Sequence, residues 1–159
     1  MKRRYFLIFL FVVFVCFALI FYVFKKFLEE SKRAHTHGTV SAVNAALISE
    51  LETEKTTLKE IFSSADHHWR FLTIDEYDRV IAELAKSYNL DPSPKPSQPL
   101  IDLWENRLDI CYRKLPDQVY ETIVISKGPD GVYRTADDVA NPGGFNVAEQ
   151  LPNVHKNRH

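Results

Sequence analysis

The chain has 159 residues, of which 45% are hydrophobic and 26% charged, with 20 Lys and Arg against 21 Asp and Glu. That length accommodates one modest domain and an appendage. The formal net charge of -1 gives no electrostatic reason to expect a nucleic-acid or acidic partner, so we expect no nucleic-acid binding.

An uncharged apolar run, residues 5–24, lies near the N-terminus. As an α-helix its twenty residues would span about 30 Å, the thickness of a bilayer core. The rival interpretation is a cleavable secretory signal, but the run is long for one and no small-residue cleavage site follows it. We therefore predict a single transmembrane helix within an anchor and juxtamembrane segment, residues 1–38. Lys and Arg flank the run on both sides, so their distribution does not decide its orientation.

Two amphipathic helices are predicted next. Apolar residues at intervals of three, four and seven indicate a helix over 39–62 and a second one over 74–88. Thr73 and Glu76 have the spacing of a capping box at the start of the second helix. The Pro-rich segment 91–99 is incompatible with regular helix or a central strand, and it separates a helical half from a strand-like half.

The second half contains two strand patterns and an acidic loop. Leu108, Ile110 and Tyr112 alternate with polar or small residues, which is typical of a half-buried strand. Residues 119–125 form a second, more apolar strand pattern. Residues 126–139, which we call the acidic loop, follow directly, and the tail 146–159 is predicted to be loose.

The acidic loop carries Asp130, Asp137 and Asp138, and it begins with the tetrapeptide 128–131, Gly-Pro-Asp-Gly, a type I turn pattern. Two interpretations of the loop remain open from the residues alone. It is either a solvated acidic hairpin tip or a site for a hard cation such as calcium, which prefers carboxylate and carbonyl oxygens.

The sequence contains no pattern that favours an enzyme. No Ser/His/Asp or Cys/His arrangement, phosphate loop or zinc-ligand spacing stands out. Asp130 and Asp137 are the nearest approach to paired catalytic carboxylates, but a hairpin tip is a poor place to raise a carboxyl pKa. We therefore expect no catalytic residues.

The second half resembles the major pseudopilin of type II secretion systems. The resemblance rests on DLWENRL at 102–108, on two strands, and then on SKGPDG at 126–131 and TADDV at 135–139. The order and spacing of these segments match the family over roughly 99–141. The hydrophobic N-terminus that leads into an amphipathic helix also suits a pilin-like chain.

The resemblance implies an α+β, pilin-like domain over 39–145 with a small antiparallel sheet behind the membrane helix. It further implies a structural subunit of the inner membrane, single-pass, with an extracytoplasmic domain and with other pilin-like subunits or secretion machinery as partners. It implies calcium in the acidic loop. The implied metal ligands are Asp130, Asp137 and Asp138 with backbone carbonyls near Ser126 and Lys127, and the implied structural motif is Trp104, Asn106, Gly128, Pro129 and Gly131.

The chain also departs from the family pattern. The family begins with a prepilin peptidase site, Gly before an apolar run that contains a Glu, and this chain has neither residue there. The alternative function is therefore a membrane-anchored pilin-like binding module that does not enter a fibre. Glu105 and Arg134 stand where the family has Gly, so positive φ at these positions would be strained. Arg134 also offers a counter-charge to the loop acids in place of a cation.

Overall fold

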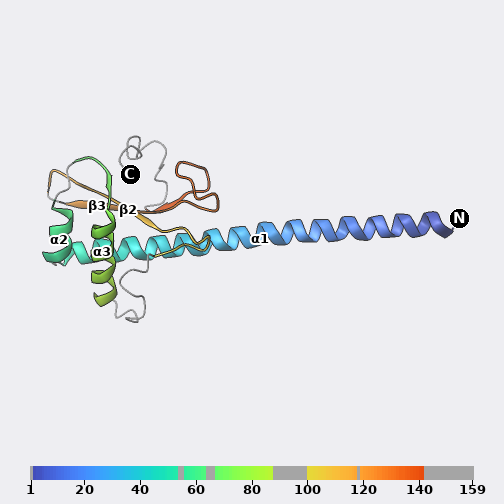
Figure 1. Cartoon of the computed structure of the whole chain (residues 1–159), viewed down its shortest axis with the longest axis horizontal. Helices are drawn as coiled ribbons and strands as arrows, with labels where there is room; N and C mark the ends of the chain where they lie inside the picture. The colour runs from blue at the N-terminus through green and yellow to red at the C-terminus, as the bar shows by residue number, and fades with distance from the viewer. Residues whose placement is uncertain (1, 54–55, 64–66, 88–99, 118, 142–159) are drawn as a thin grey trace. The chain divides into compact units, whose positions relative to one another are not determined.

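The computed structural model describes residues 2–53, 56–63, 67–87, 100–117 and 119–141 of the chain (Figure 1). The elements are α1 (Lys2–Glu52), α2 (Thr56–Phe62), β1 (Arg70–Phe71), α3 (Ile74–Ser87), β2 (Asp109–Lys114), β3 (Tyr120–Ser126) and β4 (Val139–Asn141). A long apolar helix followed by a small antiparallel sheet confirms the α+β class. The predictions for the Pro-rich segment 91–99 and the tail 146–159 lie outside the described residues.

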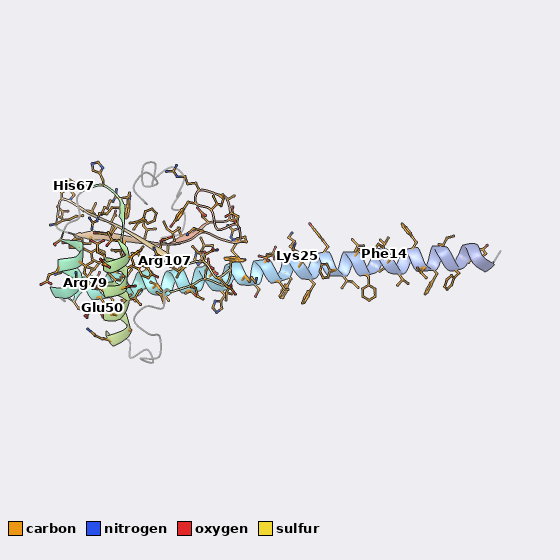
Figure 2. The ribbon with its side chains drawn as sticks, in the orientation of Figure 1. Phe14, Lys25, Glu50, His67, Arg79 and Arg107 are labelled. Carbon is orange, nitrogen blue, oxygen red and sulfur yellow. The ribbon has the colours of Figure 1, made fainter. Side chains whose placement is uncertain are left out.

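The chain divides into two units, Met1–Ala34 and His35–His159. The first unit contains only the N-terminal part of α1, whose apolar side chains project outward around the helix, as Phe14 does in Figure 2. Phe14 is 70% exposed and Phe17 71% exposed. Among the described residues, α1 is the one helix long and apolar enough to cross a membrane. A bilayer would supply the apolar surroundings that such side chains require.

The second unit is built on a four-stranded sheet with the order β1-β2-β3-β4, in which every neighbouring pair is antiparallel. The hairpin of β2 and β3 forms its centre, from the pair Asp109↔Ile125 to the pair Lys114↔Tyr120. The Leu115 N–H donates to the Val119 carbonyl at 2.8 Å and closes the turn between them. Both central strands match their predicted positions to within one residue.

One face of the sheet packs against the C-terminal part of α1 and against α2 and α3, and this is the main core. Phe62 of α2 meets Tyr112 of β2 edge to face, with the ring centroids 4.5 Å apart. The buried residues of this core are Val40, Leu47, Leu51, Leu58, Ile61, Phe62, Leu72, Tyr77, Val80, Ile81, Leu84, Leu108, Ile110, Tyr112, Val124 and Val139. The helix periodicity and the alternate residues of β2 therefore meet in a single cluster.

The prediction that β2 is half-buried is wrong, because its second face is buried too. Cys111 is 0% exposed and packs with Ile123 and Ile125 of β3, while Phe71 and Tyr133 contact the same cluster. Asp109, on the face predicted to meet solvent, is 1% exposed. The alternation of apolar and polar residues identified β2 as a strand. It did not reveal what the second face of β2 contacts, because that is decided by the apolar neighbours in β3.

The capping box at the start of α3 is confirmed. The Thr73 N–H donates to Glu76 Oε2 at 2.8 Å, and the Glu76 N–H donates to Thr73 Oγ1 at 3.3 Å. Two backbone donors of the first turn are thereby satisfied. On the buried side of the helix, the Tyr77 hydroxyl accepts a hydrogen bond from the Leu100 N–H at 3.2 Å. Burial raises the pKa of Tyr77 to about 12.

The single helix predicted over 39–62 is instead two helices. α1 ends at Glu52 and α2 begins at Thr56. At the end of α1, Thr53 Oγ1 donates to the Glu50 carbonyl at 3.0 Å. A side-chain hydroxyl therefore bonds a backbone carbonyl of the last turn of the helix. Thr is a weak helix former because its branched side chain and hydroxyl favour such local bonds. The apolar periodicity continues across the break since both helices pack on the same core.

Four polar side chains join α1 to the sheet, and we call them the amide seam. Asn44 Nδ2 donates to Asn141 Oδ1 at 3.0 Å, and Asn44 Oδ1 accepts from Thr122 Oγ1 at 2.9 Å. Asn141 Nδ2 in turn donates to Ser41 Oγ at 2.7 Å. Asn44 is only 3% exposed, so its amide needs both partners. The seam therefore defines one position of α1 along strands β3 and β4.

Candidate functional site

The candidate site begins with a tight turn over 102–106, which we call the Asp102 turn. The Asp102 N–H donates to the Asn106 carbonyl at 2.9 Å. The Asp102 carboxylate lies inside the turn, where Oδ1 accepts from the N–H groups of Trp104 at 2.8 Å and Asn106 at 2.9 Å. Asp102 is 5% exposed. A carboxylate that accepts several N–H bonds holds a short segment in one conformation.

The Asp102 turn is bonded directly to the acidic loop. Ser126 Oγ donates to Asp102 Oδ2 at 2.6 Å, and Asn106 Nδ2 donates to the Gly128 carbonyl at 2.7 Å. Ser126 Oγ also accepts from the Gly128 N–H at 3.2 Å. The two segments that carry the family resemblance, more than twenty residues apart in the chain, thus form one hydrogen-bonded unit. Both segments were identified from the sequence, but this bonding and the role of Asp102 were not predicted.

The glycines of the loop meet close backbone contacts. Gly128 has φ 64°, and a Cβ placed on it would lie 2.6 Å from the Asp137 carbonyl oxygen and 2.8 Å from Asp137 Oδ2. Gly131 has φ 67°, and its Cβ would lie 3.2 Å from Asn106 Oδ1. The Gly131 N–H reaches the Gly128 carbonyl at 3.4 Å, which closes the predicted turn around exposed Pro129. Gly128 therefore allows the two ends of the loop to touch.

The three loop acids differ in their surroundings. Asp130 is exposed, and its Oδ1 accepts from the Val132 N–H at 2.8 Å. Asp138 is half-buried, and its Oδ2 accepts from the Arg134 N–H at 2.7 Å. Burial raises the pKa of Asp138, and the charges of Asp137 and Asp130 raise it further, while the Arg134 N–H lowers it. The three acids thus share one region of negative potential.

The acidic loop contains three carboxylates, but the structure does not bring them together as a metal-ligand group. Within the described residues, no three His, Cys, Asp or Glu side chains form a group that could hold a metal ion. A cation here would thus need backbone carbonyls beside the carboxylates, a donor set that calcium accepts. The close approach of Gly128 to both the carbonyl and the carboxylate of Asp137 brings oxygen donors to the neck of the loop.

Two non-glycine residues of the site have left-handed backbone. Glu105, in the Asp102 turn, has φ 66°, and Arg134, in the acidic loop, has φ 71°. These are the only non-glycine residues with positive φ in the described parts of the chain. They are also the two positions at which the resemblance implies glycine, so the expected strain is present at both. Trp104, another residue of the implied motif, lies half-buried beside Glu105.

A separate recess of about 640 Å³ lies between α1, α2 and β3. Asn44, Thr122 and Asn141 of the amide seam line it, together with Trp69 and Arg113. The Arg113 guanidinium lies 4.5 Å from the centre of the Trp69 ring and contacts Glu121 at 2.6 Å. Arg113, Glu121 and Trp69 are therefore engaged with one another in the wall of the recess.

No protein-family model, curated protein or solved structure matches this chain.

Proposed function

We propose that the chain is a membrane-anchored structural subunit of the pseudopilin kind rather than an enzyme. The observation that carries this proposal is the bonded unit made by the Asp102 turn and the acidic loop. Its bonds from Ser126 to Asp102 and from Asn106 to Gly128 join the two segments on which the resemblance rests. The positive φ of Glu105 and Arg134, at the family's glycine positions, supports the same proposal independently.

In the proposed subunit, calcium binds the acidic loop. Asp137 and Asp138 would supply carboxylate oxygens, with backbone carbonyls near Ser126 and Lys127, and Asp130 would contribute at the exposed rim. When bound, the ion supplies positive charge that offsets the repulsion among the loop acids. The raised pKa of Asp138, with burial as its first cause and neighbouring acids as further causes, supports a place where positive charge is favourable.

The proposed setting is the inner membrane. We place the second unit outside the cytoplasm, as the resemblance implies, where calcium is available to sites with Kd on the order of 0.1–1 mM. The proposed partners are other pilin-like subunits or secretion machinery in the same membrane.

A second candidate function keeps the fold and omits the fibre. The observation in its favour is that residues 5–24 contain no acidic residue. In the family, a Glu in this run is thought to steer subunit packing. The chain would then be a single-pass binding module with a pilin-like domain. Mass spectrometry of the mature N-terminus separates the two: removal of the first residues favours the fibre subunit, and an intact N-terminus favours the module.

The calcium proposal is tested by thermal melting of the full chain in detergent micelles, with calcium or with a chelator. A cation that binds only the folded loop stabilises it by about 2.7 kcal/mol at a hundredfold excess over Kd. We expect a higher melting temperature in calcium, and we expect Asp137→Asn to abolish the difference. Asp117→Asn, in the exposed turn between β2 and β3, is the matched control and should retain it. Equal melting of the unsubstituted chain in both conditions would contradict the proposal.

A further inference from the structure

A buried carboxylate outside the predicted site, that of Asp109, contacts two residues of the acidic loop. Asp109 is the first residue of β2, and its side chain is 2% exposed. A carboxylate so far from water needs compensating charge and hydrogen bonds. From the sequence, Asp109 was predicted only as a polar residue in the alternation of a half-buried strand.

The compensation comes from three side chains. Arg107 precedes β2 in the chain, and its Nη2 atom donates to Asp109 Oδ1 at 3.1 Å. The other oxygen, Oδ2, accepts a hydrogen bond from the Tyr133 hydroxyl and lies 3.7 Å from Lys127 Nζ. The Lys127 ammonium also lies 5.1 Å from the centre of the Tyr133 ring. Two positive charges and one phenol therefore surround a single carboxylate.

Lys127 and Tyr133 lie on opposite sides of the turn 128–131, so one oxygen atom of Asp109 holds both limbs of that turn. The Tyr133 ring is supported in turn by Phe71 of β1, with the ring centroids 5.5 Å apart. We propose that Asp109 is a positioning residue that closes the acidic loop by holding Lys127 and Tyr133, the residues on either side of its turn. Its effect on cation affinity rests on the proposed function, whereas its effect on loop closure does not.

The charges of the loop show why such a closure is needed. Asp130, Asp137 and Asp138 repel one another, and this repulsion opposes the compact form of the loop. The attraction of Lys127 and Tyr133 to Asp109 acts in the other direction and involves none of the three acids. The loop can therefore be ordered before a cation arrives, and a preordered site binds more tightly because less ordering accompanies binding.

Hydrogen exchange of the full chain in micelles with chelator tests the closure. Tyr133→Phe removes only the hydroxyl that Asp109 accepts from and leaves the ring on Phe71. We expect the amides of 127–138 to exchange about tenfold faster, while those of β2 and β3 keep their protection. Tyr120→Phe is the matched control, because it removes a tyrosine hydroxyl at the other end of the β2–β3 hairpin from Asp109. Loop exchange as slow as in the unsubstituted chain would overturn the proposal.

Two further measurements separate positioning from general stabilisation. Asp109→Asn should open the same amides more strongly, and if that variant does not fold, Tyr133→Phe alone decides. By calcium titration, Tyr133→Phe should weaken binding several-fold, whereas a residue that only stabilises the fold would leave the affinity unchanged. If the unsubstituted chain binds no calcium, the proposed function fails, and the exchange result still decides whether Asp109 closes the loop.

Discussion

The strain at Glu105 can be measured by replacing it with the residue its backbone favours. A non-glycine residue in left-handed conformation costs about 1–2 kcal/mol, because its Cβ crowds the following carbonyl. Glycine removes that cost but makes the unfolded chain more flexible, which costs about 0.5–1 kcal/mol. The Glu105 side chain is exposed, so its removal loses no core contact. The net expectation for Glu105→Gly is a gain of about 0.5–1 kcal/mol.

Thermal melting followed by circular dichroism provides the assay. For a folded unit of this size, a gain of about 0.5–1 kcal/mol raises the melting temperature by about 2–5 °C. Glu105→Ala is the control, since it removes the same side chain beyond Cβ and keeps the strain. We expect it to melt close to the unsubstituted chain. If Ala and Gly raise the melting temperature equally, side-chain removal and not backbone relief explains the gain, and the reasoning from φ is refuted.

Two other substitutions test the loop. Gly128→Ala should destabilise the fold by about 2–4 kcal/mol, because the φ of Gly128 is positive and the new Cβ would collide with the Asp137 backbone. A melting temperature within about 1 °C of the original would show that the loop shifts to accommodate the methyl group. The raised pKa of Asp138 means that the folded state penalises its charge, so this contribution to stability is present below the ordinary carboxyl pKa and is lost as pH rises through the raised value. In chelator, Asp138→Asn should therefore remove part of the loss of stability that occurs as pH rises above the ordinary carboxyl pKa, as measured by urea unfolding, and a variant with the same pH dependence as the original would contradict this.

Sequence patterns predicted the elements that carry long periodic signals. The apolar run, the capping box at Thr73 and the hairpin of β2 and β3 all follow from local residue order. β1 and β4 were missed because they have two and three residues, too few for an alternation to show. Such strands exist only because the edges of β2 and β3 offer them backbone partners, which is information that no short window contains.

The residues of the candidate site were named from the sequence, but their bonds were not predicted. Glu105 and Arg134, where the resemblance implies glycine, both have positive φ. That Asp102 would bond Ser126 could not be read from spacing, since the two are brought together by the sheet. Asp109 was missed for a related reason: its partners Lys127 and Tyr133 belong to the acidic loop, which follows β3 in the chain and is brought to β2 by the fold. The one hint of this contact in the sequence was that Asp109, a charged residue within a strand pattern, lies two positions after Arg107.

The amide seam has a mechanical consequence. Its hydrogen bonds join Ser41 and Asn44, one turn apart on α1, to Asn141 and Thr122 on neighbouring strands. A displacement of α1 along its axis would strain these bonds together, because Ser41 and Asn44 move with the same helix. A slip of one helical turn, about 5.4 Å, would separate all of them and leave buried amide groups without partners. The seam therefore opposes sliding of α1 along the sheet.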